Sequence, residues 1–282
     1  MTAADGPAPG ALVVVAHPDD EILWLMPAVP LASRIVAALP LTARASLNEG
    51  RAKVRGLYPL PGMKWLPLTS PGVHRASDWS RRRPTGYGVE LADHCDPGKD
   101  RSYRANYALM LEQLAPYVQA CSEVFTHNPW GEYGHEEHVQ VSNAVVELAC
   151  RYGRAAWGWD GFGERQLLRE GTRLRRDYYH RSAASAPRRD LQADLDLYRQ
   201  IRRLYLENDA WTWHAGYEPP SVSTYIALAD GGERLVGPSP RRPVLWAWRA
   251  ASTRGRLAVC RRAALAKSRS ARTARRGPAT TD

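Results

Sequence analysis

The chain has 282 residues, 44% of them apolar, and a formal net charge of +10; this length suits one large α/β domain, or one domain with a tail, better than two domains. No run approaches the roughly 20 apolar residues of a membrane-spanning helix, the first ten residues lack the basic start of a signal peptide, and the scattered cysteines form no CxxC pair. We therefore expect a cytoplasmic protein that is neither an integral membrane protein nor a disulfide scaffold. The charge is uneven, because residues 234–282 carry +12 and residues 1–233 carry −2.

The first predicted element is a buried strand, Val13 to Ala16, which ends at a polar cluster, His17 to Glu21. Small and β-branched apolar residues in a row suit a parallel strand that is covered on both faces. The cluster then lies at the carboxyl end of the strand, where open α/β sheets bind ligands, and a helix begins near Asp20. His17 and Asp20 are close enough across the turn to bind one metal ion while Asp19 stays free, as metal-assisted hydrolysis requires. The alternative is that the acids only cap the helix.

Residues 21–68 alternate between helical and strand-like patterns. An apolar helix over 21–28 is predicted to stop or kink at Pro27. After it, the patterns predict a strand, a helix and a strand, over 33–39, 46–57 and 63–68. Such alternation is typical of a parallel, Rossmann-like sheet. The polar segment 69–102 is predicted as a long loop of the kind that is usually functional or mobile, and its Arg81–Arg83 triplet could meet a phosphate or only water.

A second polar cluster also follows an apolar pattern. Apolar residues between Tyr107 and Val118 recur at helical spacing, and this helix leads into a strand over Glu123 to Thr126. His127 and Asn128 then stand at another carboxyl strand end. We expect them to line the same pocket as the first cluster.

Two further histidines, His135 and His138, are three positions apart. If a helix has begun there, both rings share one face, which Val141 and Val145 continue. One imidazole can then bind a metal ion while the other meets the substrate.

The patterns of the remaining body predict a strand, an amphipathic helix and a strand, over 155–159, 191–206 and 221–228. Trp157 and Trp159, and likewise Trp211 and Trp213, alternate as neighbours in a strand do, so each pair sends its rings to one face. Aromatic rings can stack on sugars, but tryptophans are more often in a core or an interface. The pattern leaves both interpretations open.

The basic tail, residues 241–276, also has two interpretations. A helix with Leu257 and Val259 on one side and cations such as Arg256 and Arg261 could hold the protein peripherally on the inner face of an anionic membrane. The alternative is a disordered, soluble extension. Contact with nucleic acid is not expected.

The two polar clusters together resemble the PIG-L/LmbE-like family of zinc-dependent N-deacetylases, which are similar to N-acetylglucosaminyl deacetylases. The family's Ala-His-Pro-Asp-Asp-Glu motif stands at Ala16 to Glu21, and its Gly-x-Tyr-Gly-His-x-x-His motif at Gly131 to His138. The resemblance covers roughly residues 11–230 in order and layout, and is specific at the two motifs. It implies an α/β fold, with a Rossmann-like, mostly parallel sheet and helices on both faces, in a deacetylase domain over 1–233. A basic, partly disordered extension over 234–282 follows.

The sequence departs from the family at several positions. Trp24 and Met26 stand where relatives usually have small residues, often a Gly pair. Glu136 and Glu137 replace the usual Pro and Asp, which should alter the start of the helix more than the ligands. The family often has an Arg that helps hold the sugar in the helix after the second strand. Arg51 is the nearest match, but we predict a solvated surface position for it.

The resemblance implies a zinc site made of two imidazoles and one carboxylate, those of His17, Asp20 and His138. Such a set leaves an open position for water, and iron would fit the same ligands. Asp19 is then the general base that accepts a proton from the water. Tyr133, and His135 if it is protonated, would stabilise the oxyanion. The proton for the leaving nitrogen could come from His135 or from Asp19.

Three functions follow as alternatives. The first is hydrolytic removal of an acetyl group from an N-acetyl amino sugar such as N-acetylglucosamine, free or attached to a glycoside or lipid carrier; the resemblance alone supplies the sugar. The second is an amidase that acts on another acylated amine, such as a thiol-sugar conjugate. The third is a non-catalytic basic protein that binds a membrane or nucleic acid, which the full set of expected catalytic groups argues against.

Overall fold

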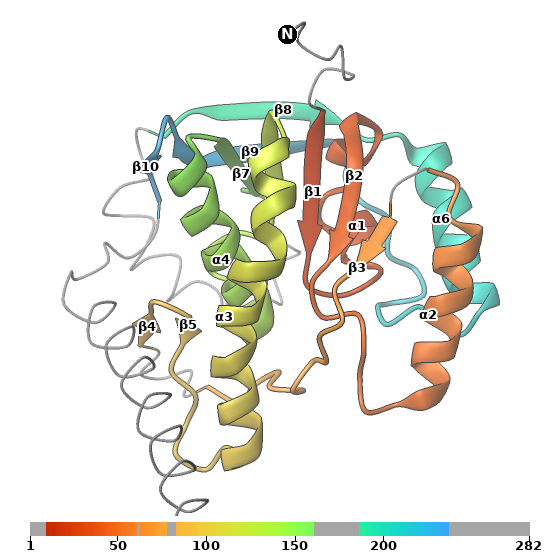
Figure 1. The fold of residues 1–282 in the computed structure, drawn as a ribbon. Helices are drawn as coiled ribbons and strands as arrows, with labels where there is room; N and C mark the ends of the chain where they lie inside the picture. Colours follow the sequence, from red (N-terminus) through yellow and green to blue (C-terminus); the bar gives the residue numbers. More distant parts are fainter. Residues whose placement is uncertain (1–9, 61–62, 78–82, 161–185, 237–282) are drawn as a thin grey trace, which may run out of the picture. The chain divides into compact units, whose positions relative to one another are not determined.

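The computed structural model describes residues 10–60, 63–77, 83–160 and 186–236, and these form an eight-stranded sheet with helices around it (Figure 1). The strands of this sheet are β1 (Ala11–Val15), β2 (Ala32–Ala37), β3 (Met63–Trp65), β6 (Glu123–Thr126), β7 (Ala155–Trp159), β8 (Arg188–Gln192), β9 (Val222–Asp230) and β10 (Glu233–Arg234). Their order in space is β10-β9-β7-β6-β1-β2-β3, with β8 also paired to β9.

Strand β1 lies inside the sheet and runs parallel to β2 on one side and to β6 on the other. The pairs β2–β3 and β6–β7 are also parallel, whereas β9 is antiparallel to β7, β8 and β10. The predicted α/β fold with a mostly parallel, Rossmann-like sheet is confirmed. Because β2 and β3 follow on one side of β1, and β6 and β7 on the other, β1 and β6 form the switch point at which such sheets bind ligands.

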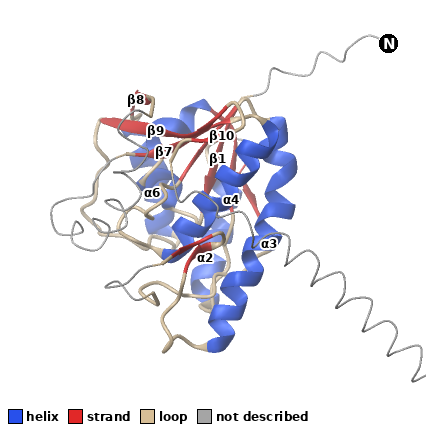
Figure 2. Ribbon diagram, turned by 90° about the vertical axis from the view of Figure 1, so that its left-hand side faces the viewer, coloured by secondary structure: helices blue, strands red, loops and turns tan. Residues whose placement is uncertain are grey.

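Helices cover both faces of the sheet, as predicted. They are α1 (Asp20–Leu23), the 3₁₀ helix η1 (Met26–Leu31), α2 (Ala45–Leu57), α3 (Pro97–Ala120), α4 (Glu136–Tyr152) and α6 (Leu195–Glu207). Leu12 and Val14 of β1 pack into a core shared with α3 and α4, and Val13 and Val15 into a core shared with α1, η1 and α6. This division arises because successive side chains of a strand point to opposite faces. Figure 2 shows α3 and α6 on opposite sides of β1.

The helix predicted over residues 21–28 is shorter than expected. Helix α1 ends at Leu23, because the ring of Pro27 clashes with the carbonyl four residues earlier in a continued α-helix. The 3₁₀ helix η1 follows, with Pro27 in its first turn and Pro30 inside it. Met26 to Val29 are buried, so the segment covers the sheet as predicted.

The helix predicted over 191–206 begins four residues later than expected. Leu191 lies instead in β8, where it pairs with Ser223 of β9. The carboxylate of Asp194 accepts a hydrogen bond from the N–H of Leu197 at 2.9 Å and caps α6. Capping chemistry, rather than apolar spacing, determines where this helix begins.

The two tryptophan pairs differ in their backbone. Trp157 and Trp159 lie in β7 and pack on the same face of the sheet, as predicted. The strand-like alternation predicted for Trp211 and Trp213 is wrong, because both lie in an irregular segment between α6 and β9. Their rings nevertheless pack against the same core as the other pair.

The segment predicted as a loop over 69–102 contains some regular structure. A short hairpin is formed by β4 (Pro84–Thr85) and β5 (Gly88–Val89). Helix α3 begins inside the segment, with the carboxylate of Asp96 as its cap. Within the Arg81–Arg83 triplet, the structure describes Arg83, whose guanidinium lies 3.7 Å from the carboxylate of Glu90.

In the part of the chain that the structure describes, no helix is long and apolar enough to cross a bilayer. Of the predicted extension, 234–282, the structure describes residues 234–236, and Arg234 lies in β10. The proposed membrane contact of the tail falls outside the described residues. That contact and the predicted domain boundary stay predictions.

Candidate metal and catalytic site

The two polar clusters meet at the carboxyl ends of β1 and β6. The parallel pairing of these strands extends to Val14 and Thr126, and the hydroxyl of Thr126 donates to the carbonyl of Val14 at 3.0 Å. Immediately beyond, the N–H of Ala16 donates to Nε2 of His127 at 2.8 Å. Segments 111 positions apart in the sequence are thereby fixed side by side.

The three predicted metal ligands converge on one carboxylate oxygen. Oδ2 of Asp20 lies 3.2 Å from Nδ1 of His17 and 3.3 Å from Nε2 of His138. Two ligand atoms at the usual bond length from a tetrahedral zinc ion are about 3.3 Å apart. Burial opposes ionisation of Asp20, but the two imidazoles outweigh it and hold the pKa of this carboxyl well below its usual range. Each imidazole therefore lies at a zinc-like spacing from the Asp20 carboxylate.

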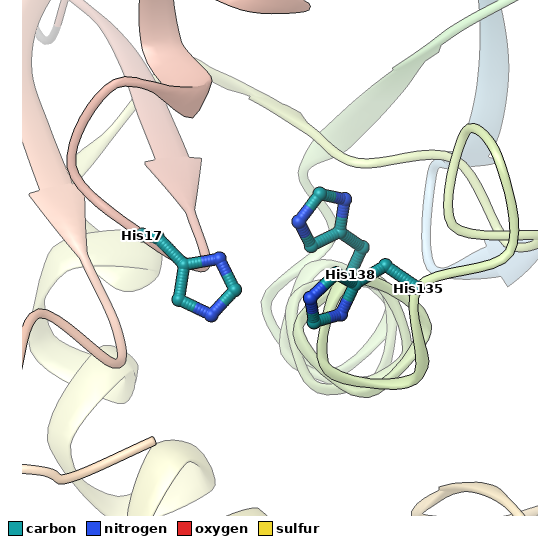
Figure 3. Close-up of side chains that lie close together, drawn as sticks. All are labelled: His17, His135 and His138. Atoms are coloured by element: carbon teal, nitrogen blue, oxygen red, sulfur yellow. The ribbon is translucent and has the colours of Figure 1, made fainter. Parts of the chain in front are cut away.

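Other combinations of side chains lie nearby. Three groups have ligand atoms close enough together to hold an ion: His17, His135 and His138; Asp20, His127 and His138; and His74, His135 and Glu136. The predicted set is not itself one of these groups, because it takes His17 from the first and Asp20 from the second and shares His138 with both. Figure 3 shows His17 facing His135 and His138, which project from the start of α4. The rings of His135 and His138 are stacked, 4.4 Å between centroids and 9° between planes, so their in-plane lone pairs do not converge on a shared ion.

His138 has an acceptor atom prepared for a metal. Its Nε2 is buried and accepts no hydrogen bond from the described residues. Its Nδ1 lies 2.7 Å from Oε2 of Glu132, and in the neutral ring a carboxylate there keeps the proton on Nδ1 and the lone pair on Nε2. Burial lowers the pKa of His138, but Asp20 and Glu132 raise it to about 10. Binding of an ion must therefore displace a proton from this ring.

His127 and Asn128 are wholly buried and stabilise the strand ends. Because Nε2 of His127 accepts from the N–H of Ala16, its Nδ1 carries the proton, which is donated to Oε2 of Glu132 at 3.1 Å. The side-chain amide of Asn128 donates to the carbonyl of Trp159 at 3.1 Å. Both side chains thus use their polar atoms within the protein.

His17 is held by Glu137 of the first turn of α4. Oε2 of Glu137 lies 2.6 Å from Nε2 of His17, which leaves Nδ1 directed at Asp20. The other carboxylate oxygen accepts from the hydroxyl of Ser70 at 3.0 Å and from the N–H of Gly72 at 3.1 Å. One buried acid thereby orients a predicted ligand and anchors the segment that follows β3.

Asp19 occupies the N-cap of α1 with a left-handed backbone, φ 94°. Its Oδ2 accepts from the N–H of Thr212 at 2.9 Å and from the hydroxyl of Thr212 at 2.6 Å. Burial raises the pKa of Asp19 to about 6, against the opposing charge of Arg51 and the hydrogen bonds from Thr212, and the nearby Asp20 adds to the rise. Asp19 is therefore ionised at neutral pH and basic enough to accept a proton.

The prediction that Arg51 lies on the solvated surface is wrong. Its side chain is buried, and its guanidinium donates to the carbonyl of Pro40 at 3.1 Å. Leu47 and Val54, one helical turn away on either side, are also buried, so Arg51 lies on the inward face of α2. Its charge lowers the pKa of Asp19. The spacing of the two apolar neighbours would have placed this residue correctly.

His135 and Tyr133 lie beside the predicted ligands. Nδ1 of His135 accepts from the N–H of Glu137 at 3.2 Å, which leaves the proton on Nε2. Burial and the neighbouring histidines hold the pKa of His135 well below its usual range, so the fold favours a neutral ring that donates through Nε2 rather than a protonated one. The ring of Tyr133 packs against those of Trp213 and His74, with centroid distances of 5.2 and 5.6 Å.

The sequence did not identify four side chains that touch this site. Glu132 and Glu137 lie inside the second motif, and an acid near a ligating histidine is a common partner of its second nitrogen. Thr212 is 193 positions from Asp19, and no local pattern connects them. Trp24 lies in an apolar run that gives no sign of a polar contact, yet its Nε1–H donates to Oδ1 of Asp20 at 3.2 Å.

Comparison with known proteins adds little to this geometry. No family model matches the chain, and no curated protein matches it in sequence. Among solved structures, the zinc-inhibited form of teicoplanin deacetylase Orf2 aligns at 9% identity with a TM-score of 0.48, over 82% of this chain and 99% of that chain. A deacetylase–bog complex from teicoplanin biosynthesis aligns at 10% identity and a TM-score of 0.44, with the same coverage. A deacetylase–teicoplanin complex from the same pathway aligns at 12% identity with a TM-score of 0.40, over 77% of this chain and 97% of that chain. TM-scores below 0.5 at such identities do not place the chain in a family.

Proposed function

We propose that this protein is a zinc-dependent hydrolase that removes an acetyl or related acyl group from the amide nitrogen of an N-acetyl amino sugar or its glycoconjugate. The observation that supports this most is the position of Asp20 Oδ2, within 3.3 Å of a nitrogen of both His17 and His138, with the buried Asp19 next to it in the chain. Two imidazoles and one carboxylate are the ligand set of hydrolytic zinc sites, which keep an open position for water.

Zinc held by His17, Asp20 and His138 would polarise an amide carbonyl and lower the pKa of bound water to about 7. Iron fits the same ligands. Nε1–H of Trp24 donates a hydrogen bond to Oδ1 of Asp20, which leaves Oδ2 as the oxygen directed at the two imidazoles.

The residues of the chain supply the acid–base chemistry. Asp19, with a pKa near 6, accepts the proton of the attacking water, while Thr212 holds the orientation of its carboxylate. Nε2–H of His135 and the hydroxyl of Tyr133 are the donors available to the oxygen on which negative charge develops. The leaving nitrogen takes its proton from His135 or from the newly protonated Asp19. The products are a carboxylate, acetate in the simplest case, and a free amine.

The amino-sugar substrate is proposed from the two motifs and from aromatic rings beside the site. The two sequence motifs supply the amino sugar by resemblance, and the rings of Tyr133, Trp213 and His74 beside the site offer flat faces of the kind on which sugar rings stack. An amidase for another acylated amine, such as a thiol-sugar conjugate, would use the same catalytic groups. The identity of the amine that is released distinguishes the amino-sugar deacetylase from such an amidase.

The test is metal content followed by acyl release. Purified protein should contain one zinc per chain, and a panel of N-acetyl amino sugars and other N-acyl amines should show which amide releases its acid. Asp19→Asn should retain the zinc and lose about 10²- to 10⁴-fold in turnover, because a positioned general base contributes that much. Wild-type turnover in this variant would rule out Asp19 as the base, and a metal-free, inactive wild type would rule out the function.

A further inference from the structure

Glu132 is a buried acid that the catalytic scheme above does not use. Oε2 of its carboxylate lies 2.7 Å from Nδ1 of His138 and 3.1 Å from Nδ1 of His127. Its Oε1 accepts from the N–H of Asn128 at 3.0 Å. Burial opposes ionisation of Glu132, but the two imidazoles lower the pKa of its carboxyl to about 2. One carboxylate oxygen is thus shared by two imidazoles.

The backbone at Glu132 is unusual for a glutamate. Its φ is +53°, in the left-handed region that favours glycine and asparagine. The turn is closed by hydrogen bonds from the N–H groups of Gly134 and His135 to the carbonyl of Gly131, and Glu132 itself donates from its N–H to Oδ1 of Asn128. A residue with a long side chain at such a position points to a role for that side chain.

The two imidazoles that share Glu132 have different partners on their other nitrogen. Nε2 of His127 accepts from the N–H of Ala16, whereas Nε2 of His138 is buried without such a donor among the described residues and lies 3.3 Å from Oδ2 of Asp20. The two rings are stacked at 4.0 Å with 21° between their planes. The pair is therefore oriented as one unit, with only one of its two Nε2 atoms open to an ion.

We propose that Glu132 is a positioning residue that fixes the tautomer and ring orientation of His138, so that Nε2 faces the ion, and that it holds His127 in the same tautomer as a buried support that does not bind metal. This role rests on the proposed function, because it needs a metal at His138. Asp20, His127 and His138 are then not the ligand set. To bind metal through Nε2, His127 would have to give up the hydrogen bond that it accepts from the N–H of Ala16.

Glu132→Gln is the diagnostic change. Both Nδ1–H groups point at one oxygen, and the N–H of Asn128 points at the other. An amide has one oxygen and one NH₂ group, so in either orientation of the glutamine a donor faces a donor. The variant should bind zinc 10- to 100-fold more weakly than the wild type, the usual loss when a partner of a ligating histidine is removed.

The matched control is Glu147→Gln, on the same helix as His138. Glu147 also accepts from a ring-bearing side chain, the hydroxyl of Tyr107 at 2.8 Å, but it touches no predicted ligand. This variant should bind zinc as the wild type does. Affinity is measured for full-length, folded protein by competition with a chromophoric chelator.

A second measurement separates positioning from general stability. In zinc-loaded wild-type protein, the Nδ1–H protons of His127 and His138 should give two slowly exchanging, downfield proton resonances, as expected for imidazole N–H groups bonded to a carboxylate. In Glu132→Gln at least one should move upfield and exchange faster, and in Glu147→Gln neither should change. Equal zinc affinity and unchanged resonances in Glu132→Gln would overturn the proposal.

Glu132→Asp covers the case in which the glutamine variant does not fold. Aspartate suits a left-handed backbone better and keeps the charge, but it is one methylene shorter and cannot reach both rings as glutamate does. A zinc affinity of Glu132→Asp below that of the wild type supports the role, and wild-type affinity overturns it. If the wild type binds zinc but cleaves no amide, the proposed function fails while the comparison of these variants still decides the role of Glu132.

Discussion

Thr212 determines how the proposed base presents its carboxylate. Two donors of one residue, its N–H and its hydroxyl, hold Oδ2 of Asp19, so Oδ1 is the oxygen left to take a proton. These bonds stabilise the charged form and lower a pKa that burial raises. Thr212 is exposed and lies beside Trp211 and Trp213 in the irregular segment after α6. The segment that carries these aromatic rings therefore also adjusts the chemistry of the base.

Thr212→Val should shift the pH dependence of hydrolysis. The base is active as a carboxylate, so the rate rises with pH as Asp19 ionises. Loss of the hydroxyl removes a bond that lowers its pKa, so the pKa rises and the rising limb of kcat/KM against pH moves to higher pH. Thr212→Ser, which keeps the hydroxyl, should restore the wild-type profile. If the rising limb of Thr212→Val lies at the same pH as that of the wild type, the hydrogen bond from the Thr212 hydroxyl does not affect the pKa of Asp19.

Trp24 is expected to act on the metal through Asp20. Its Nε1–H binds Oδ1 of Asp20, and its ring packs against Trp159 with centroids 5.4 Å apart. Trp24→Phe keeps an aromatic ring and removes the donor, so Oδ1 is free to turn, and zinc affinity should fall by about tenfold or more. Trp159→Phe makes the same change at a buried ring without a bond to Asp20 and is the control. Equal losses in both variants would assign the effect to packing.

At the scale of elements, the first turn of α4 holds the segment after β3. The carboxylate of Glu136 accepts from the N–H of Arg75 and from the N–H and the hydroxyl of Ser77, and Glu137 accepts from Ser70 and Gly72. Acids in a first helical turn also suit the positive end of the helix. Part of the predicted loop 69–102 is thus fixed to the helix that carries His138.

Glu136→Ala should release this attachment. Two backbone N–H groups and the hydroxyl of the buried Ser77 lose their acceptor, and an unsatisfied buried donor is destabilising by about 1–3 kcal/mol. We expect a loss of that size in the free energy of unfolding by denaturant and faster hydrogen exchange at the amide of Ser77. Glu112→Ala, at an exposed position of α3, should change stability by less than about 0.5 kcal/mol. Unchanged exchange at Ser77 would contradict the attachment.

Sequence patterns predicted those parts of the fold that depend on neighbours in the chain. Apolar runs located β1 and β6, and the two strand ends brought His17 and the second motif together as expected. The sequence patterns did not predict features that depend on a contact between residues far apart in the chain. The burial of Arg51 against Pro40 depends on how α2 packs on the sheet. The hydrogen bond from Thr212 to Asp19 and the irregular path of Trp211 and Trp213 depend on how the chain passes from α6 to β9. Pro27 predicted that the first helix stops or kinks, but not that α1 already ends at Leu23.

At the scale of the whole molecule, charge is divided between two parts of the sequence. Residues 1–233 carry −2 and residues 234–282 carry +12. A nearly neutral body does not by itself attract an acidic partner, so any electrostatic attraction to an anionic surface belongs to the tail. For a lipid-linked amino sugar, such attraction would bring the proposed site to its substrate.

Binding to vesicles distinguishes a membrane-bound tail from a soluble extension. If the tail holds the protein on an anionic membrane, each Lys or Arg near the surface adds about 1 kcal/mol, screened by salt within a Debye length. The full chain should then bind vesicles that contain anionic lipid and dissociate from them at high salt. It should not bind neutral vesicles. A chain that ends at Pro240 removes twelve cations, keeps every residue of the proposed site, and should lose this binding while hydrolysing a small soluble substrate unchanged. Equal vesicle binding by the shortened chain would reject the membrane role, and loss of soluble-substrate activity would show that the tail belongs to the folded body.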